Sequence, residues 1–350
     1  MSDREGVLPG DRATGRASWV DWIIDRIDHL AVPRWVPYTL LFLIPPALMV
    51  APVWMSGRAA PAENFAFYLL IGFWTVFPLA LMHYLDRFSE RALEAFRPAC
   101  DLDEAETAAM GRRLTTMPAG PAALAGLLGA VFVAALYLAA PQLYQVIQAS
   151  PAQFAIGFIV LSVNFALLGS LIYHTVRQLR LVSALYDRAR RLDLFNLTPL
   201  YAFSGLSART AIAWALAIYL SAVLFPALTG NPITIAVVLL QIALLVAVFT
   251  FPLIGIHRRI QAAKDKAVEE VGASLQRTIR ELNRRTEPLQ LDEMDALNKL
   301  VTALIAGRDV LARVPTWPWS PGTPVAVGSA LLLPVALFVI ERVLAGFFGL

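Results

Sequence analysis

Seven long apolar segments constrain this chain more than any other feature. They lie near residues 37–56, 65–84, 121–140, 152–174, 211–228, 233–256 and 324–348. A helix of about 20 apolar residues crosses the hydrocarbon core of a bilayer. The Asn231-Pro232 turn separates the fifth segment from the sixth, because a helix does not continue easily through Gly-Asn-Pro. The sequence therefore predicts an all-α, polytopic membrane protein with seven transmembrane helices.

Basic residues orient these segments. Of the 29 Lys and Arg residues, all but two fall on one set of alternating connections, and cytoplasmic loops carry the excess of positive charge. We therefore expect the N-terminus inside and the C-terminus outside. Arginine greatly outnumbers lysine and alanine is abundant, which is typical of a GC-rich bacterial genome. The predicted location is the cell inner membrane, with multiple passes.

The same pattern divides the chain into four parts. Residues 1–36 form a cytoplasmic N-terminus, in which Trp19, Trp22, Ile23, Ile27 and Leu30 indicate an interfacial helix. Residues 37–256 hold transmembrane helices 1–6, with cytoplasmic helical extensions at 85–120 and 175–210. Residues 257–316 form a cytoplasmic helical hairpin. Residues 317–350 contain transmembrane helix 7.

The three extensions share a design. Each follows an even-numbered span, begins at a histidine, and continues as a charged amphipathic helix. The even-numbered helices are therefore predicted to run uninterrupted into a cytoplasmic layer. The hairpin carries two apolar stripes, one of Ala267, Val271, Leu275, Ile279 and Leu282, the other of Leu297, Leu300, Val301, Leu304 and Leu311. These stripes must be buried, either on the other extensions or on a second subunit. We favour the second subunit, and hence a homo-oligomer.

The search for chemistry gives mostly exclusions. From Pro37 to Phe338, the proposed hydrocarbon segments contain no Asp, Glu, Lys or Arg. This disfavours proton-coupled carriers and pumps, which need such groups near the midplane. The chain has no phosphate-binding loop, dinucleotide motif or HExxH, so we expect no enzyme activity and no cofactor. Acidic residues match arginine within each cytoplasmic loop, so we expect no nucleic-acid partner.

Three histidines form the one candidate metal site. His83, His174 and His257 all fall at the inner ends of even-numbered spans, and Asp86 lies one turn from His83. Three imidazoles at one depth could bind Zn²⁺, as in an intramembrane metal hydrolase. The alternative is that these amphipathic rings simply suit the membrane interface. No HxxxH or CxxC spacing favours ligation.

Polar residues inside the spans have two interpretations. Asn164 and Gln241 are typical of hydrogen bonds between helices, although either could line a pore or contact a ligand. In the last span, Gly328 and Ser329 would allow helices to approach closely. Glu341 and Arg342 fall at the outer boundary, where they either reach water and headgroups or turn one member of the pair toward a central axis. Glu341 there would favour cations, and Arg342 would favour anions.

The layout resembles the insect odorant and gustatory receptor superfamily of ion channels. It shares seven spans, an inside N-terminus, helical extensions below the membrane and a final helix compatible with a pore. The resemblance implies a tetramer held by the extensions, with the seventh helices lining a cation pore. It rests on topology, because residues 324–348 contain neither Tyr nor Gln of the family's last-span signature, and no residue roles are carried over.

The sequence thus favours an ion channel whose partners are further copies of itself, the lipid bilayer, and ions or a small-molecule ligand. A non-conducting signalling or scaffold protein is the main alternative. A membrane enzyme or carrier is the third.

Overall fold

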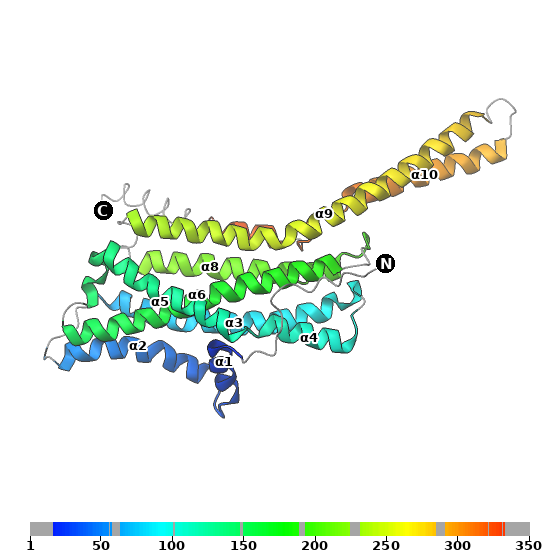
Figure 1. Ribbon diagram of the computed structural model, residues 1–350. Coiled ribbons are helices and arrows are strands. Elements are labelled where there is room, and N and C mark those ends of the chain that lie inside the picture. Colours follow the sequence, from blue (N-terminus) through cyan, green and yellow to red (C-terminus); the bar gives the residue numbers. More distant parts are fainter. Residues whose placement is uncertain are drawn as a thin grey trace, which may run out of the picture.

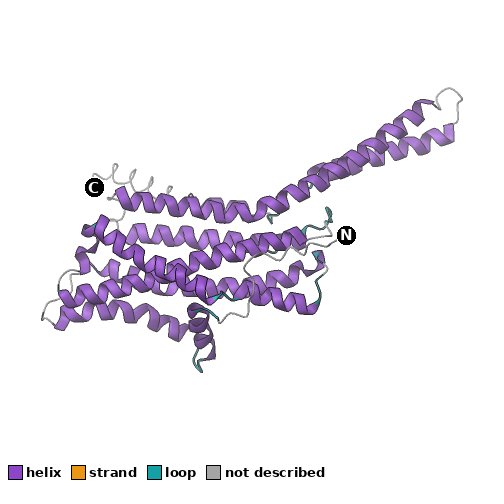
Figure 2. Cartoon of the chain, viewed as in Figure 1, coloured by secondary structure: helices purple, strands orange, loops and turns teal. Residues whose placement is uncertain are grey.

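The computed structural model describes residues 17–55, 57, 64–100, 102–147, 150–188, 193–224, 232–284, 291–320, 322–330 and 332. Every regular element in these ranges is a helix (Figure 2). In order they are α1 Trp19–His29, α2 Trp35–Met55, α3 Phe65–Phe96, η2 Arg97–Ala99, α4 Glu104–Thr115, α5 Ala119–Ala139, η3 Pro141–Ile147, α6 Pro151–Arg188, α7 Thr198–Tyr201, α8 Ser204–Leu224, α9 Pro232–Arg284 and α10 Leu291–Arg313.

Six helices in the described ranges are long and apolar enough to cross a membrane: α2, α3, α5, α6, α8 and α9. They coincide with the first six apolar segments of the sequence, so the helical, multi-pass membrane class is confirmed. The seventh predicted span begins as a helix at residues 323–330. Most of that span lies outside the described residues.

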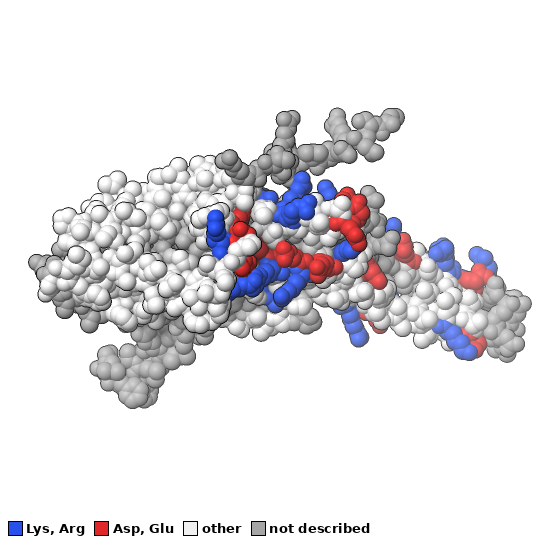
Figure 3. Space-filling model, turned by 90° about the horizontal axis from the view of Figure 1, so that it is seen from below, with Lys and Arg blue, Asp and Glu red and all other residues white. Residues whose placement is uncertain are grey.

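The surface of the bundle agrees with a lipid environment. On α5, the side chains of Leu124, Leu127, Leu128 and Val131 are each more than half exposed. Water would penalise so large a continuous apolar surface, whereas hydrocarbon does not. Figure 3 shows that the charged side chains gather at one end of the bundle and on the projecting arm, while the other described residues on the visible face are not Lys, Arg, Asp or Glu.

The extensions of α3, α6 and α9 leave the bundle at the end where α1, α4 and α10 lie (Figure 1). α3, α6 and α9 each continue past their histidine without a break, as predicted. The extensions predicted at 85–120 and 175–210 are not single helices, because α6 ends at Arg188, and α3 ends at Phe96, where the chain turns back as α4. Pro98 lies in the intervening η2, and Asp103 and Glu106 form a capping box that starts α4.

Three aromatic rings form the core between these extensions. Phe96 and Phe203 are fully buried, and Tyr186 is only 1% exposed. Phe96 meets the other two rings edge-on, with centroids 5.3 and 5.4 Å away. Tyr186 donates a hydrogen bond of 2.8 Å to the carbonyl of Leu200, so its hydroxyl is satisfied inside this apolar core. The extensions of α3 and α6 therefore share a packed interior with the segment that leads into α8.

The opposite end is closed by η3. Tyr144 of η3 is 4% exposed and donates a hydrogen bond of 2.8 Å to the carbonyl of Val133 on α5. Burial raises the pKa of Tyr144 to about 12. The phenol therefore stays protonated, and available as a donor, at physiological pH.

Glycines bring α5 and α6 into backbone contact. A Cβ atom on Gly129 of α5 would lie 2.0 Å from the carbonyl oxygen of Phe165, and one on Gly169 of α6 would lie 2.3 Å from that of Ala125. Both distances are far below a van der Waals contact. Small residues permit this approach between membrane helices.

We expect Gly129→Ala to lower the free energy of unfolding by about 1–3 kcal/mol, because the new methyl group meets a backbone carbonyl that cannot rotate away. Equilibrium unfolding in mixed micelles measures the change. Gly120→Ala is the matched control on the same helix, because its Cβ would meet no atom within 4 Å. Equal stability of the two variants would contradict the close α5–α6 contact.

The hairpin of α9 and α10 projects away from the bundle (Figure 1). Most of the predicted stripes form its seam: Val271, Leu275, Leu282, Leu297, Val301 and Leu304 are half-buried, and Leu311 is buried. Ile279 and Leu300, assigned to the same stripes from sequence, are instead 40% and 47% exposed. They lie at the edges of the seam, where one partner helix is too narrow to cover them.

Side chains close the base of the hairpin. The Lys264 ammonium donates to the carbonyls of Ala312 and Val314, at 2.7 and 2.9 Å. A cation here satisfies carbonyls that the end of α10 leaves unpaired. This contact fixes α10 against α9 where the chain turns toward the last span.

Candidate functional site

The charged end of the bundle is organised around α1. The Asp21 carboxylate accepts hydrogen bonds from the backbone N–H of Ser18, at 3.1 Å, and of Met117, at 2.9 Å. The Ser18 hydroxyl accepts in return from the N–H of Asp21, which completes a capping box. A β-bridge joins Ala17 to Pro118. The first turn of α1 is therefore tied to the connection between α4 and α5.

The predicted helix at residues 18–30 is present, but its apolar side chains divide between two faces. Val20 and Ile27 are buried against the bundle, as expected for side chains seven residues apart on a helix. Trp22 and Leu30, which the sequence placed with Ile27, are 57% and 51% exposed. Contact of these two exposed side chains with the membrane surface remains a prediction.

His83 lies at the centre of a polar cluster between α1, α2 and α3. Its side chain is 9% exposed. The Tyr38 hydroxyl donates to Nδ1 at 2.9 Å, and Nε2 lies 3.2 Å from Oδ2 of Asp28. The imidazole thus connects a phenol on α2 to a carboxylate on α1.

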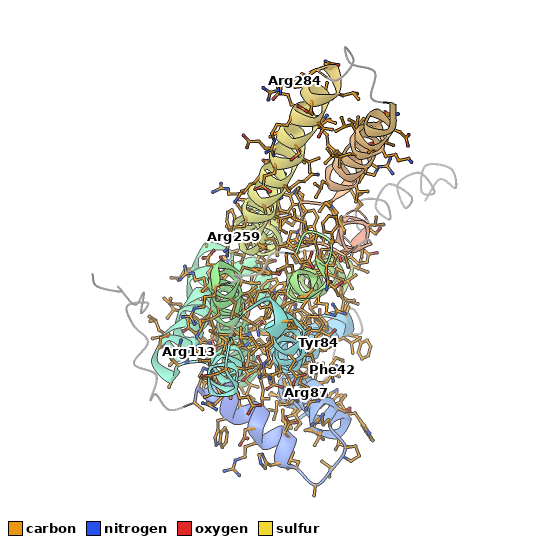
Figure 4. The ribbon with its side chains drawn as sticks, turned by 90° about the vertical axis from the view of Figure 1, so that its right-hand side faces the viewer. Phe42, Tyr84, Arg87, Arg113, Arg259 and Arg284 are labelled. Carbon is orange, nitrogen blue, oxygen red and sulfur yellow. The ribbon has the colours of Figure 1, made fainter. Side chains whose placement is uncertain are left out.

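Two arginines complete the surroundings of Asp28. Nε of Arg34 is 2.8 Å from its Oδ1, and a guanidinium nitrogen of Arg87 is 3.3 Å from the same atom. Figure 4 looks onto this end and labels Arg87, between α3 and the first two helices. Asp28 therefore holds the end of α1 to the start of α2 and to α3.

A second imidazole–carboxylate pair joins α6 to α3. Nε2 of His174 donates to Oδ1 of Asp86 at 2.9 Å, and the two side chains are 2% and 14% exposed. The other ring nitrogen of His174 is buried without a hydrogen-bond partner. The attraction within a buried pair is offset by the hydration that both groups lose. The main effect of this pair is therefore to fix the position of α6 against α3.

A cleft of about 670 Å³ opens between α1 and α3 beside both clusters. It is lined by Asp21, Asp25, Asp28, His83, Asp86, Arg87 and Glu90, among others. Three of its carboxylates are already used: Asp21 caps α1, Asp28 meets arginines, and Asp86 holds His174. The arrangement therefore positions α1 on the bundle through polar contacts.

The three candidate metal-binding histidines have separate partners. His83 contacts Tyr38 and Asp28, His174 contacts Asp86, and Nδ1 of His257 lies 3.1 Å from the carbonyl oxygen of Thr316. Asp86, expected beside His83, is bonded to His174 instead. In the part of the chain that the structure describes, no group of three or more His, Cys, Asp or Glu is arranged to hold a metal ion.

His257 belongs to a stack of four rings. It lies parallel to Trp317 at 4.1 Å, Trp317 to Trp319 at 4.6 Å, and Trp319 to Phe249 at 5.2 Å, all within 13° of parallel. Stacking over this area, together with the bond to Thr316, anchors the segment that leads into the last span.

Asn164 connects α6 to α3 at span depth, as predicted. It is 4% exposed, donates to the carbonyl of Ile71 at 3.0 Å, and accepts from the Thr75 hydroxyl at 2.7 Å. Gln241 is half-buried, and its side chain makes no hydrogen bond within the described part of the chain. The cross-helix role therefore holds for Asn164 only.

The helical turns at residues 323–330, where the predicted seventh span begins, face two ways. Val327 and Ala330 are buried on the bundle, whereas Ser329 is exposed. A Cβ atom on Gly328 would meet no atom within 4 Å. Gly328 and Ser329 thus lie beside open space, while Glu341 and Arg342 lie outside the described residues.

Sequence reasoning missed the partners of His83. Tyr38 lies 45 positions away, at the start of the first span, and Asp28 lies on α1. Such pairings depend on which helices are neighbours, and local spacing carries no signal of that. Asp86 was visible as a candidate because it is close to His83 in sequence, yet its side chain faces α6.

Comparison of the chain with protein-family models, with curated proteins and with solved structures finds no match.

Proposed function

We propose that this protein is a homo-oligomeric membrane channel, assembled through the α9–α10 hairpin and conducting ions along an axis lined by its last helices. The supporting observation is the hairpin surface. Ile279, Leu300, Ile305 and Val310 are each at least 40% exposed on an arm that projects from the bundle. Outside the hydrocarbon core, uncovered apolar side chains of this size mark an interaction surface.

The exposed residues of α10 favour a ring. Side chains five residues apart on a helix point about 140° apart, so Leu300 and Ile305 lie on opposite sides of the seam, and Val310 lies close to the direction of Lys299. The back of the helix carries the Lys299–Asp295 ion pair. An exposed apolar side chain on each side of the seam suits a subunit that contacts one neighbour on each side, as cyclic assemblies require. We favour a tetramer, as the resemblance in topology implies.

The start of the last helix supports the proposal that these helices surround a central conducting axis. Gly328 and Ser329 adjoin open space, which a neighbouring helix could fill closely. In this proposal Glu341 or Arg342 forms a charged ring at the outer mouth and sets ion selectivity.

The second candidate is a non-conducting signalling or scaffold protein. It is favoured by Asn164, a buried amide whose hydrogen bonds to Ile71 and Thr75 both lie within one subunit. Because Asn164 is hydrogen-bonded within one subunit, any conducting path in our proposal runs between subunits. Both candidate functions use the same assembly surface.

Planar-bilayer recording on the purified protein distinguishes the two candidates. The channel predicts single-channel currents, and a shifted reversal potential in Glu341→Gln or Arg342→Gln. Unchanged reversal potentials in both variants, despite measurable current, would remove these residues from the pore. Absence of current from a correctly assembled oligomer would favour the scaffold.

The proposed orientation, N-terminus inside and C-terminus outside, rests on the distribution of Lys and Arg. With Cys100 replaced by Ser, we expect a membrane-impermeant maleimide to label Ala59→Cys and Gly349→Cys in intact cells. Ala262→Cys, on an exposed position of α9, should react only after permeabilisation. Labelling of residue 262 in intact cells would reverse the orientation.

A further inference from the structure

A groove of about 310 Å³ lies between α6 and α9, on the side of the bundle away from α1. Its walls are mainly apolar, and Arg180 and Ser183 are its polar members. The lining residues are Val176, Leu179, Arg180, Ser183, Leu244, Ala247 and Phe251. This volume is within the usual range for a small-molecule site, about 300–1,000 Å³.

The polar and apolar parts of the groove are ordered along the helices. Val176, Leu179, Arg180 and Ser183 recur at spacings of three and four, so they share one face of α6. The polar pair follows the apolar pair in the direction of the charged end. Phe251 of α9 is 69% exposed, so the groove opens beside this ring onto the apolar surface of the bundle.

Arg180 is available to a ligand. Its side chain is exposed, and it has no hydrogen-bond or ion-pair partner among the described residues. The neighbouring arginines differ: Arg177 donates to the carbonyl of Arg113, and Arg259 of α9 donates to the carbonyl of Tyr186. Figure 4 labels Arg259 near the point where α9 leaves the bundle. Arg180 is thus a cation at the edge of an apolar groove, with no counter-ion in the part of the chain that the structure describes.

Asp187 limits where a ligand's negative charge can lie. Its Oδ1 would be 3.9 Å from a Cβ atom on Gly255 of α9, so a carboxylate lies between α6 and α9, one turn beyond Ser183. An anion is therefore favoured at Arg180 and disfavoured one to two turns further along.

A buried polar atom lies at the other end. Thr175 is 3% exposed and its hydroxyl has no hydrogen-bond partner. It lines a small hollow of about 10 Å³ that shares Val176 and Leu244 with the groove. An unsatisfied buried hydroxyl carries a free-energy cost, which an oxygen atom placed there would relieve.

From these features we infer that the groove binds one phospholipid with an anionic headgroup, taken from the leaflet at the charged end. Phosphate oxygens accept hydrogen bonds from the Arg180 guanidinium and the Ser183 hydroxyl. An acyl chain lies along Val176, Leu179, Leu244 and Phe251. A water trapped in the small hollow reaches Thr175. Basic positions between transmembrane helices on the cytoplasmic side recognise anionic lipids in this way.

The test uses the full-length protein, delipidated in detergent and titrated with phosphatidylglycerol or phosphatidylcholine of matched chains. Native mass spectrometry counts bound lipid, and thermal unfolding follows the stabilisation. We expect phosphatidylglycerol to bind at least about ten-fold more tightly, the factor that one charge-assisted hydrogen bond supplies. Arg180→Gln should remove this preference. Arg277→Gln, which removes the same charge from the distant hairpin, should retain it.

A second variant tests the acyl part. Ala247→Phe fills the groove while leaving Arg180 in place, and should weaken the binding of both lipids. Equal affinities for the two lipids in the parent protein would overturn the inference. If glycerol phosphate competes for the site as effectively as the lipid does, the protein binds only the phosphate. That result would contradict binding of an acyl chain in the groove. Unchanged lipid binding in Ala247→Phe would show that the acyl chain binds to another part of the protein, and would contradict the inference.

Discussion

His174→Leu is expected to lower the free energy of unfolding by about 3–5 kcal/mol, the usual cost of removing one partner from a buried pair. The imidazole is 2% exposed and donates to Asp86 at 2.9 Å. Without it, the Asp86 carboxylate keeps its burial and loses its donor. Equilibrium unfolding in mixed micelles measures the difference, which is a large part of the 5–15 kcal/mol typical of folded domains.

Two further variants identify the cause. His174→Leu combined with Asp86→Leu replaces both polar groups, and should recover at least half of the lost stability. Lys299→Ala breaks the exposed Lys299–Asp295 pair on α10, and should cost no more than about 1 kcal/mol. A double variant as unstable as His174→Leu alone would show that the cavity, and not the unpaired carboxylate, sets the cost.

Leu300→Asp and Ile305→Asp are each expected to weaken self-association about 30- to 700-fold, the range for loss of 2–4 kcal/mol at an interface hot spot. The residues are 47% and 46% exposed in the single chain, so the substitutions should leave the subunit folded. In the proposed ring each lies on a different contact side, and a buried carboxylate opposes that contact. Mass photometry over a dilution series measures the shift toward monomers.

Ala306→Asp is the matched control. Residue 306 is exposed on the back of α10, on the same side as Lys299 and Asp295, so it adds the same charge outside the proposed contacts. Leu275 makes a poorer test position, because it lies in the seam and a charge there would open the hairpin itself. Assembly unchanged by both Leu300→Asp and Ile305→Asp would locate the interface elsewhere.

Most of the fold could be predicted from the length of the apolar segments and from the helical spacing of apolar residues. Apolar runs of about 20 residues identified the six spans, because hydrocarbon requires closed helical hydrogen bonding over its full depth. The absence of Gly or Pro after Tyr173 predicted the unbroken continuation of α6. The turn into α4 was readable from Pro98 and the capping pair Asp103 and Glu106, although the sequence interpretation treated that region as one extension.

Partner choice was not predictable in the same way. The histidines were expected where the even-numbered spans leave the membrane, and each lies well inside α3, α6 or α9, but position along a helix says nothing about which carboxylate each one meets. Asp86 contacts His174, and not His83, because α3 turns that side chain toward α6. Likewise, Ile279 and Leu300 fit a helical stripe, yet only the crossing of α9 and α10 decides which members of a stripe are covered.

The central claim, self-assembly through the hairpin, is tested most directly by the mass of the intact particle in a lipid nanodisc or mild detergent. One subunit has a mass of 38.3 kDa. After subtraction of bound lipid and detergent, the account predicts a discrete multiple of that mass, with four copies favoured, that is lost in Leu300→Asp and Ile305→Asp and kept in Ala306→Asp. A particle that stays at 38.3 kDa across the concentration range, with its helices folded, would contradict it.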